Sequence, residues 1–142
     1  MQSTVTWQGN VALQASTESG HELQMDGAPA YGGENLGARP MELILAGLGG
    51  CASFDVGTIL KKARQEIDSV ECQLQAEGAD EIPAVFTKIH LHFVVKGKKV
   101  KASQVEKAIH LSADKYCSAS RMLVNGGVDI THDFEVIELA DV

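Results

Sequence analysis

The stretch PMELILAGLGGC, residues 40–51, begins the segment that decides the fold. Proline is tolerated at the first position of a helix, and apolar side chains then recur around most of the helical circumference as far as Leu60. A helix that is apolar on nearly all sides is predicted to be central and buried. The basic run KKAR, residues 61–64, places positive charges where the C-terminal end of a helix favours them.

Alternating apolar and polar residues flank this helix on both sides and predict half-buried strands. Further along, SQVE at residues 103–106 has the spacing of a capping box and predicts the start of a second helix. The predicted elements are a strand meander over 1–26, a glycine-rich loop over 27–39, the central helix over 40–66, a strand pair over 69–97, a second helix over 103–120 and a C-terminal strand over 127–139. Together they predict a single α+β domain over residues 1–142.

The composition narrows the class of protein. Of the 142 residues 44% are apolar, and the net charge is −7. This acidic balance repels phosphate backbones and anionic lipids, so neither nucleic acid nor a membrane is expected as a partner. The N-terminus lacks the basic and apolar features of a targeting segment, and no apolar run is expected to reach the length of a bilayer span. We therefore expect a cytoplasmic location.

Three cysteines in a cytoplasmic protein argue against a framework of structural disulfides. Cys51 and Cys117 lie in two separate predicted helices, and packing of those helices would make the two thiols a candidate redox couple. Arg121, one turn beyond Cys117, would favour its thiolate, although an exposed arginine is equally ordinary there. Cys72 shares the apolar face of a predicted strand and is interpreted as a core residue.

Three glycines, at positions 47, 49 and 50, precede Cys51 inside the predicted helix. Each costs roughly 1 kcal/mol relative to alanine in a helix interior. One explanation is the close approach of another helix over the bare backbone. A second is a local break that leaves Cys51 near a helix N-terminus, where its thiol pKa would fall. In a third interpretation Cys51 is a small buried residue at a tight helix crossing.

Two groups of residues that contain histidine could serve as metal ligands. His90 and His92 share one strand face, but further ligands cannot be placed, so a solvated or interface face is favoured. His110, Asp114 and Cys117 have a helical spacing that suits a metal ion, yet His110 and Asp114 are equally expected on an exposed helix. The sequence therefore predicts no metal and no cofactor.

The chain resembles the OsmC/Ohr family of osmotically induced and organic hydroperoxide resistance proteins. The resemblance rests on Pro40-Met41-Glu42-Leu43 followed by Ala46-Gly47 and Cys51, the glycine-rich loop before them, a second cysteine 66 residues after the first, and the terminal strand. It implies an OsmC-like fold in which antiparallel sheets wrap around two long central helices. It also implies an intertwined homodimer with the active site at the subunit interface.

For function, the resemblance implies a cysteine-based peroxidase that takes part in the response to oxidative stress. Cys51 would attack a small organic hydroperoxide, Cys117 would resolve the sulfenic acid as a disulfide, and a dithiol reductant would restore both thiols. In active family members an arginine held by a glutamate supports the thiolate. The matching candidates here are Arg39 and Glu42.

Three departures from the family pattern resemble a divergent branch. Met41 stands where the glutamate is usual, and Glu42, nine residues before Cys51, would face away from it on an unbroken helix. Residues 1–38 contain no arginine or lysine, and Ser118 replaces the proline that commonly follows the second cysteine. Two alternatives therefore stay open. One is a catalytically weak binding or redox-sensing protein with an apolar pocket at the dimer interface, and the other is a structural dimer with buried thiols.

Overall fold

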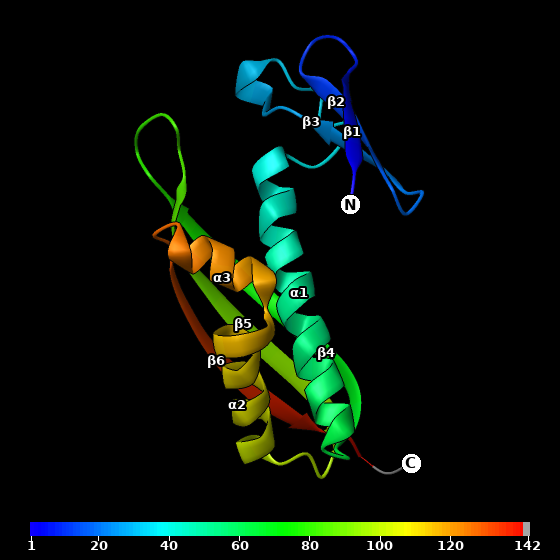
Figure 1. Cartoon of the computed structure of the whole chain (residues 1–142), viewed down its shortest axis with the longest axis vertical. Coiled ribbons are helices and arrows are strands. Elements are labelled where there is room, and N and C mark those ends of the chain that lie inside the picture. Colours follow the sequence, from blue (N-terminus) through cyan, green and yellow to red (C-terminus); the bar gives the residue numbers. More distant parts are fainter. Residues whose placement is uncertain (141–142) are drawn as a thin grey trace. The chain divides into compact units, whose positions relative to one another are not determined.

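The chain folds as an α+β protein with two three-stranded sheets, as a computed structural model of residues 1–140 shows (Figure 1). It divides into two compact units, Met1–Ala46 and Gly47–Val142, and helix α1 (Pro40–Lys62) contributes to both. The predicted α+β class is confirmed. That residues 1–142 form a single domain stays a prediction.

The first unit contains the predicted antiparallel meander. Its strands are β1 (Ser3–Trp7), β2 (Ala12–Thr17) and β3 (Glu22–Asp26), paired in that order. The predicted meander is confirmed by this pairing. It could be predicted because alternating apolar and polar residues indicate a strand.

The glycine-rich segment after β3 is more ordered than predicted. It contains the short 3₁₀ helix η1 (Pro29–Tyr31), and Ala38 bridges back to Met25. The buried carboxylate of Asp26 organises the segment, since it accepts the backbone N–H groups of Glu34 at 2.8 Å and of Leu36 at 3.1 Å. These hydrogen bonds, that from Leu36 foremost, hold the pKa of Asp26 below its ordinary value.

Helix α1 runs without interruption through the three glycines, so the local break considered from the sequence is absent. A side chain of a strand, rather than a helix, packs over the bare backbone. A Cβ at Gly49 would lie 2.7 Å from Leu74 Cδ1, whereas Gly47 and Gly50 have nothing within 4 Å of such an atom. Of the explanations left open by the sequence, a close approach over the bare backbone occurs at Gly49 alone, and a strand rather than a helix makes it.

The end of α1 comes four residues earlier than predicted. Arg64 adopts a left-handed conformation with φ of 60°, its N–H donates to the carbonyl of Lys61, and the N–H of Gln65 donates to the carbonyl of Leu60. This pair of bonds is a Schellman motif, which usually places glycine at the left-handed position. Because arginine stands there instead, the usual glycine signal for this turn is missing, and the basic run at residues 61–64 marked the helix end only approximately.

The second unit is built on a sheet of β4 (Glu66–Gly78), β5 (Phe86–Lys98) and β6 (Asp129–Glu138). β4 and β5 are antiparallel, but β6 pairs with β5 in parallel. The expectation of purely antiparallel sheets is therefore wrong. Parallel neighbours need a crossover connection, and the helical segment between β5 and β6 supplies it. Residues 47–62 of α1 and this crossover lie on one face of the sheet (Figure 1).

The crossover is not the continuous helix predicted for residues 103–120. It consists of α2 (Ala102–Leu111), the π-helical turn η2 (Ser112–Tyr116) and α3 (Ser118–Asn125). Cys117 separates η2 from α3 with an extended backbone at φ −78° and ψ 102°. The capping box is also absent, because Lys101 is the N-cap and has no side-chain capping bond. The fold thus has one long helix and one that is broken.

Helix α1 is less buried in this chain than its apolar sequence predicted. Five of its residues are buried, namely Leu48, Gly49, Ala52, Val56 and Leu60. Ile44 and Phe54 are 48% and 73% exposed. With a mean hydropathy of 1.7 over 18 residues, α1 is also long and apolar enough to cross a membrane, which corrects the expectation that no run reaches that length. The central helix of a non-membrane fold passes the same test, so this observation does not identify a span.

We predict that Gly97→Ala destabilises the protein by about 1–3 kcal/mol, the usual cost of overpacking. The new methyl group would meet the backbone carbonyl of Glu66 and would lie 2.7 Å from Val100 Cγ2. The matched control is Gly57→Ala in α1, where the nearest atom is 4.0 Å away and alanine should stabilise the helix by up to about 1 kcal/mol. Urea unfolding of both variants tests this, and equal stability of the two would contradict it.

Candidate functional site

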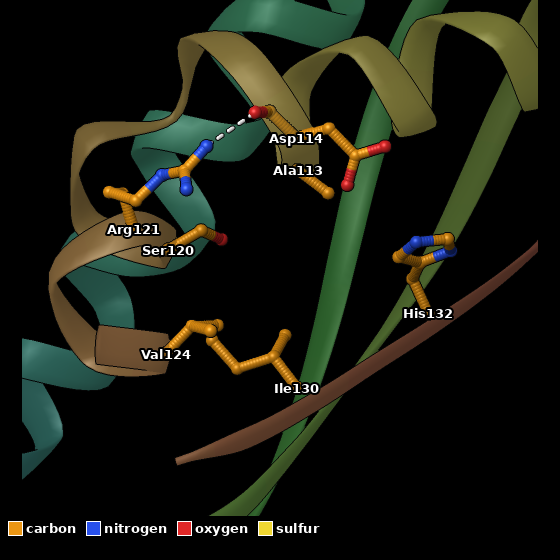
Figure 2. A pocket seen from close by; sticks show the side chains of 7 residues that line it. All are labelled: Ala113, Asp114, Ser120, Arg121, Val124, Ile130 and His132. Atoms are coloured by element: carbon orange, nitrogen blue, oxygen red, sulfur yellow. Dashed lines mark hydrogen bonds between the residues drawn. The ribbon is translucent and has the colours of Figure 1, made fainter. Parts of the chain in front are cut away.

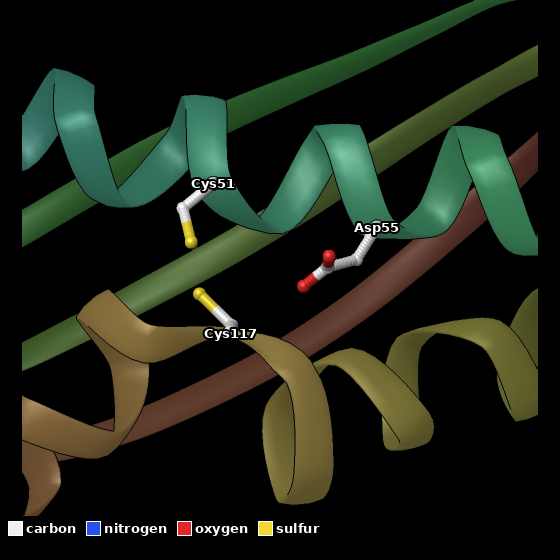
Figure 3. Close-up of side chains that lie close together, drawn as sticks. All are labelled: Cys51, Asp55 and Cys117. Atoms are coloured by element: carbon white, nitrogen blue, oxygen red, sulfur yellow. The ribbon is translucent and has the colours of Figure 1, made fainter.

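The two cysteines predicted to meet do so in the second unit. Cys51 on α1 faces Cys117 at the junction of η2 and α3 (Figure 3). The two Sγ atoms and a carboxylate oxygen of Asp55 all lie within 4.8 Å of one another. Both thiols are free. This juxtaposition of two thiols and one carboxylate is the candidate site.

The backbone around Cys117 positions its side chain. The N–H of Cys117 donates to the carbonyl of Ser112 at 2.8 Å, which closes the wide turn η2. Its Sγ then accepts the N–H of Ser120 at 3.4 Å and so caps α3. A π-helical turn often marks a functional position in a helix. Here the turn ends the helical path, and the Cys117 side chain, only 2% exposed as a residue, is directed toward α1.

Asp55 is the site residue that the sequence analysis missed. It follows Cys51 by four residues on α1, so both side chains lie on the same side of the helix. The hydroxyl of the buried Ser112 donates to Asp55 Oδ2 at 3.0 Å and fixes the carboxylate. A signal was present in the sequence, since Asp55 is an acidic residue within an otherwise apolar helical run.

The surroundings of Cys117 disfavour its thiolate form. Burial raises the pKa of Cys117, and its interaction with Cys51 raises it further, whereas the N–H of Ser120 opposes both effects. A carboxylate oxygen of Asp55 lies within 4.8 Å of both sulfurs. The guanidinium of Arg121, the cation expected to favour the Cys117 thiolate, donates to the carbonyl of Asp114 at 2.6 Å (Figure 2).

Arg39 and Glu42, the predicted electrostatic support, belong to the first unit. Glu42 Oε1 accepts the backbone N–H of Arg39 at 2.8 Å, which is half of a capping box at the start of α1. The guanidinium of Arg39 donates to Asn35 Oδ1 and to the carbonyl of Gly37. In this chain Glu42 therefore caps a helix and is hydrogen-bonded to the backbone of Arg39. The catalytic role of both residues stays a prediction.

Cys72 lies half-buried on β4, on the same face as Val70 and Leu74. Burial raises the pKa of its thiol to about 11, against a smaller opposing effect of the Ser53 side chain. The thiol is therefore protonated near neutral pH and is a poor nucleophile. The interpretation of Cys72 as a packing residue agrees with this environment.

The histidine groups form hydrogen bonds within the fold. On the outer face of the sheet, Asp133 Oδ1 lies 2.8 Å from His90 Nε2 and 2.7 Å from His92 Nδ1. His90 Nδ1 lies 2.6 Å from Thr131 Oγ1, so both ring nitrogens of His90 are engaged. His110 packs edge-on against His132 with ring centroids 5.1 Å apart. Within residues 1–140 the group with three possible metal ligands in reach of one another is Cys51, Asp55 and Cys117.

A cavity of about 400 Å³ lies between α3, η2 and β6 (Figure 2). Its lining is mixed in polarity and consists of Ala113, Asp114, Ser120, Arg121, Val124, Ile130 and His132. Ser120 connects it to the thiol site, because the same residue donates its N–H to Cys117 Sγ. Burial lowers the pKa of His132 at the wall of this cavity. The space is therefore next to the site and is not wholly apolar.

Comparison with known proteins identifies the family. The family model described as OsmC-like protein matches residues 32–133. The chain belongs to the OsmC-like protein family. The resemblance given by its cysteines and helix lead-in is thereby confirmed.

Relatives of this OsmC-like chain match it over nearly its whole length. Protein YhfA of Escherichia coli strain K12 is 40% identical over 137 residues, which cover 96% of this chain and 98% of YhfA. A crystal structure of a hypothetical protein from Aquifex aeolicus VF5 has a TM-score of 0.85 at 27% identity, with 98% and 97% of the two chains covered. The organic hydroperoxide resistance protein OhrB of Bacillus subtilis has a TM-score of 0.62 at 23% identity, with 95% and 98% covered. This last likeness concerns the fold alone.

We predict that the three cysteines of the OsmC-like chain differ in their rates of alkylation. At pH 8 iodoacetamide should label the half-exposed Cys51 first, since Cys117 is buried and the pKa of Cys72 is about 11. Labelling of Cys72 should become fast only as the pH approaches that value. Peptide mass spectrometry of the reduced protein over time gives the order. Modification of Cys72 ahead of Cys51 would contradict the description of the site.

We also predict a pH-dependent contribution of Asp133 to stability. Its hydrogen bond raises the pKa of His92 above 6.5, so this bond stabilises the fold below pH 6.5 and is lost as the pH rises through the raised pKa. The bonds from His92 and His90 lower the pKa of Asp133 below 3.8, so their contribution is lost as the pH falls through the lowered value. The stabilisation by Asp133 is therefore largest at pH values above the lowered pKa of Asp133 and below the raised pKa of His92.

Asp133→Asn should accordingly cost more stability at pH 5.5 than at pH 8.5, as measured by urea unfolding. Asp129→Asn on the same strand is the matched control, because no hydrogen bond to a histidine is described for it within residues 1–140. A cost for Asp133→Asn that does not change with pH, or equal behaviour of the two variants, would contradict the assignment.

Proposed function

We propose that this OsmC-like protein is a thiol-dependent peroxidase that reduces small organic hydroperoxides through Cys51 and Cys117. The single observation that carries the proposal is the approach of the two Sγ atoms to within 4.8 Å, from segments 66 residues apart in the sequence. A short side-chain movement would bring them to the S–S distance of about 2.05 Å.

Cys51 is the proposed peroxidatic residue because it is the more exposed of the two. Its thiolate attacks the terminal oxygen of the hydroperoxide, the O–O bond breaks, and the alkoxide leaves as an alcohol after taking up a proton. Cys51 is then a sulfenic acid. The sulfur of Cys117 displaces its oxygen as water and forms the disulfide. A dithiol reductant supplies two electrons through a mixed disulfide and restores both thiols.

The reaction requires the thiolate of Cys51, and a nearby positive charge would favour that form. Arg39 together with Glu42 is the proposed electrostatic support. The proposal for these two residues rests on the family resemblance. The Arg39 guanidinium donates to two neutral acceptors, Asn35 Oδ1 and the carbonyl of Gly37, and its charge also helps to lower the pKa of Asp26.

The names of similar structures give the proposal limited support. OhrB of Bacillus subtilis is named an organic hydroperoxide resistance protein. A protein from Legionella pneumophila, 17% identical with a TM-score of 0.71, is named both an organic hydroperoxide resistance protein and a predicted redox protein. At these identities the fold is shared, and the extension of the activity to this chain is our inference.

We further propose that the protein is a cytoplasmic homodimer. The exposed apolar side chains of α1, among them Ile44 and Phe54, fit burial against a second copy. Gly47 and Gly50 offer bare backbone on the same helix, where another chain can approach closely. Dimerisation would account for an apolar helix that one copy leaves largely exposed.

A second candidate is a redox-sensing or binding protein with little turnover. The raised pKa of Cys117 favours it, because it lowers the fraction of this thiol that is thiolate. The mixed lining of the cavity beside α3 would suit a ligand that is not wholly apolar. The two candidates differ in rate and in the number of thiols consumed.

Anaerobic thiol titration before and after a few equivalents of cumene hydroperoxide tests the proposal. We expect the loss of two thiols per chain, release of the alcohol, and full recovery with dithiothreitol. Cys51→Ser should abolish the reaction, whereas the matched control Cys72→Ser should react at the parental rate. Loss of one thiol, or very slow loss, would favour the sensing protein. Parental peroxide consumption by Cys51→Ser would remove this residue from the mechanism.

A further inference from the structure

We propose that the reduced site binds a thiophilic divalent metal ion, Zn²⁺ in the first place, through Cys51 Sγ, Cys117 Sγ and the carboxylate of Asp55. In Figure 3 the three side chains point toward one common space, two of them from α1 and one from the opposite segment. Metal binding does not depend on the peroxidase proposal. Its consequence for peroxide reduction rests on the proposed function.

The distances suit such an ion. Zinc binds thiolate at about 2.3 Å and carboxylate at about 2.0–2.2 Å in tetrahedral geometry, which places the ligand atoms about 3.6–3.8 Å from one another. The three atoms here lie within 4.8 Å of one another before any ion is present. Side-chain adjustments of about 1 Å therefore complete the geometry. The fourth position is left for water, as in zinc sites with three protein ligands.

The chemistry of the donors selects the class of metal. Two thiolates and one carboxylate favour Zn²⁺ over Mg²⁺ or Ca²⁺, which prefer sites made entirely of oxygen. The electrostatics also favour a cation. The site gathers three groups that can be anionic, and within residues 47–140 no ion pair is formed with Asp55. A divalent ion would displace the thiol protons and neutralise the resulting charge.

Hydrogen bonds from neighbouring residues already hold two of the three proposed ligands in place. The Ser112 hydroxyl donates to Asp55 Oδ2, and because a carboxylate has about four acceptor positions, room for a metal remains. The N–H of Ser120 donates to Cys117 Sγ, a bond that stabilises a thiolate. Such outer partners orient metal ligands and strengthen metal binding. Their presence distinguishes this group from a chance encounter of exposed side chains.

Metal binding and disulfide formation exclude each other at this site. Binding takes both sulfurs as thiolates and releases up to two protons to solvent, with no change in oxidation state. Disulfide formation removes two electrons from the same sulfurs and leaves them without the charge that holds the metal. The bound ion would therefore protect Cys51 and Cys117 from hydroperoxide, and oxidation would release the ion.

Titration of the reduced, metal-free protein with Co²⁺ and then with competing Zn²⁺ tests the proposal under anaerobic conditions. We expect one equivalent per chain, a near-ultraviolet sulfur-to-cobalt charge-transfer band, and loss of that band when Zn²⁺ displaces Co²⁺. Cys51→Ser should weaken the band and the affinity, while Cys72→Ser should leave both unchanged. Cobalt binding without a sulfur charge-transfer band would overturn the proposal.

Asp55→Asn tests the third ligand and keeps the shape of the side chain. Loss of an outer partner alone costs roughly 10–100-fold in metal affinity, so loss of this ligand should cost at least about tenfold. Asp68→Asn makes the same change at an exposed position of β4 and should leave the affinity unchanged. Circular dichroism shows whether each variant is folded. An Asp55→Asn affinity equal to that of the parent protein, or an equal loss in Asp68→Asn, would overturn the role of Asp55.

The outcomes separate the two proposals. Disulfide formation by hydroperoxide is measured on metal-free protein, and metal affinity is measured without any oxidant. Protein that oxidises but binds no metal would refute the metal site and leave the peroxidase standing. Protein that binds Zn²⁺ but does not react with hydroperoxide would refute the peroxidase alone.

Discussion

The parallel pairing of β6 beside β5 is the constraint on which the site depends. A chain that leaves one strand and returns as its parallel neighbour must cross the face of the sheet, and here it crosses as α2, η2 and α3. Residues 47–62 of α1 lie on the same face. The crossover therefore carries Cys117 past α1 and places it opposite Cys51. An antiparallel return of β6 would need no such crossover and would leave the two sulfurs without a common location.

The electrostatics of the site set its chemistry. Burial raises the pKa of Cys117, so this thiol is not activated by its surroundings. A nearby cation would favour the thiolate of Cys51, which is the nucleophilic form. An arginine would serve peroxide reduction, whereas a divalent metal would hold the sulfurs as unreactive ligands. The same two thiols and one carboxylate could thus serve either of two reactions, and the identity of the cation decides between them.

The first unit contains the start of α1 and a loop that is held by hydrogen bonds to residues of the same unit. Asp26 binds the backbone of residues 34 and 36, and Glu42 binds the backbone of Arg39. Both carboxylates thereby accept hydrogen bonds from backbone N–H groups that would otherwise lack an acceptor, in the glycine-rich segment and at the helix N-terminus. The departure of this chain from the common family pattern, with Met41 before Glu42, accordingly places a capping residue at the helix start.

The sequence by itself determined the types of the elements, the strand meander, the central helix and the family. Periodicity reports which side of a segment is buried, and that information is local. Only the tertiary structure decided the parallel place of β6, the break at Cys117, the end of α1 at Lys62 and the entry of Asp55 into the site. Each of these depends on a partner outside the local pattern. The bond from Ser112 to Asp55 spans 57 residues, and the Schellman turn uses an arginine where glycine is the usual signal. The periodicity of apolar residues cannot identify such partners, because it indicates that a side chain is buried but does not indicate which residues bury it.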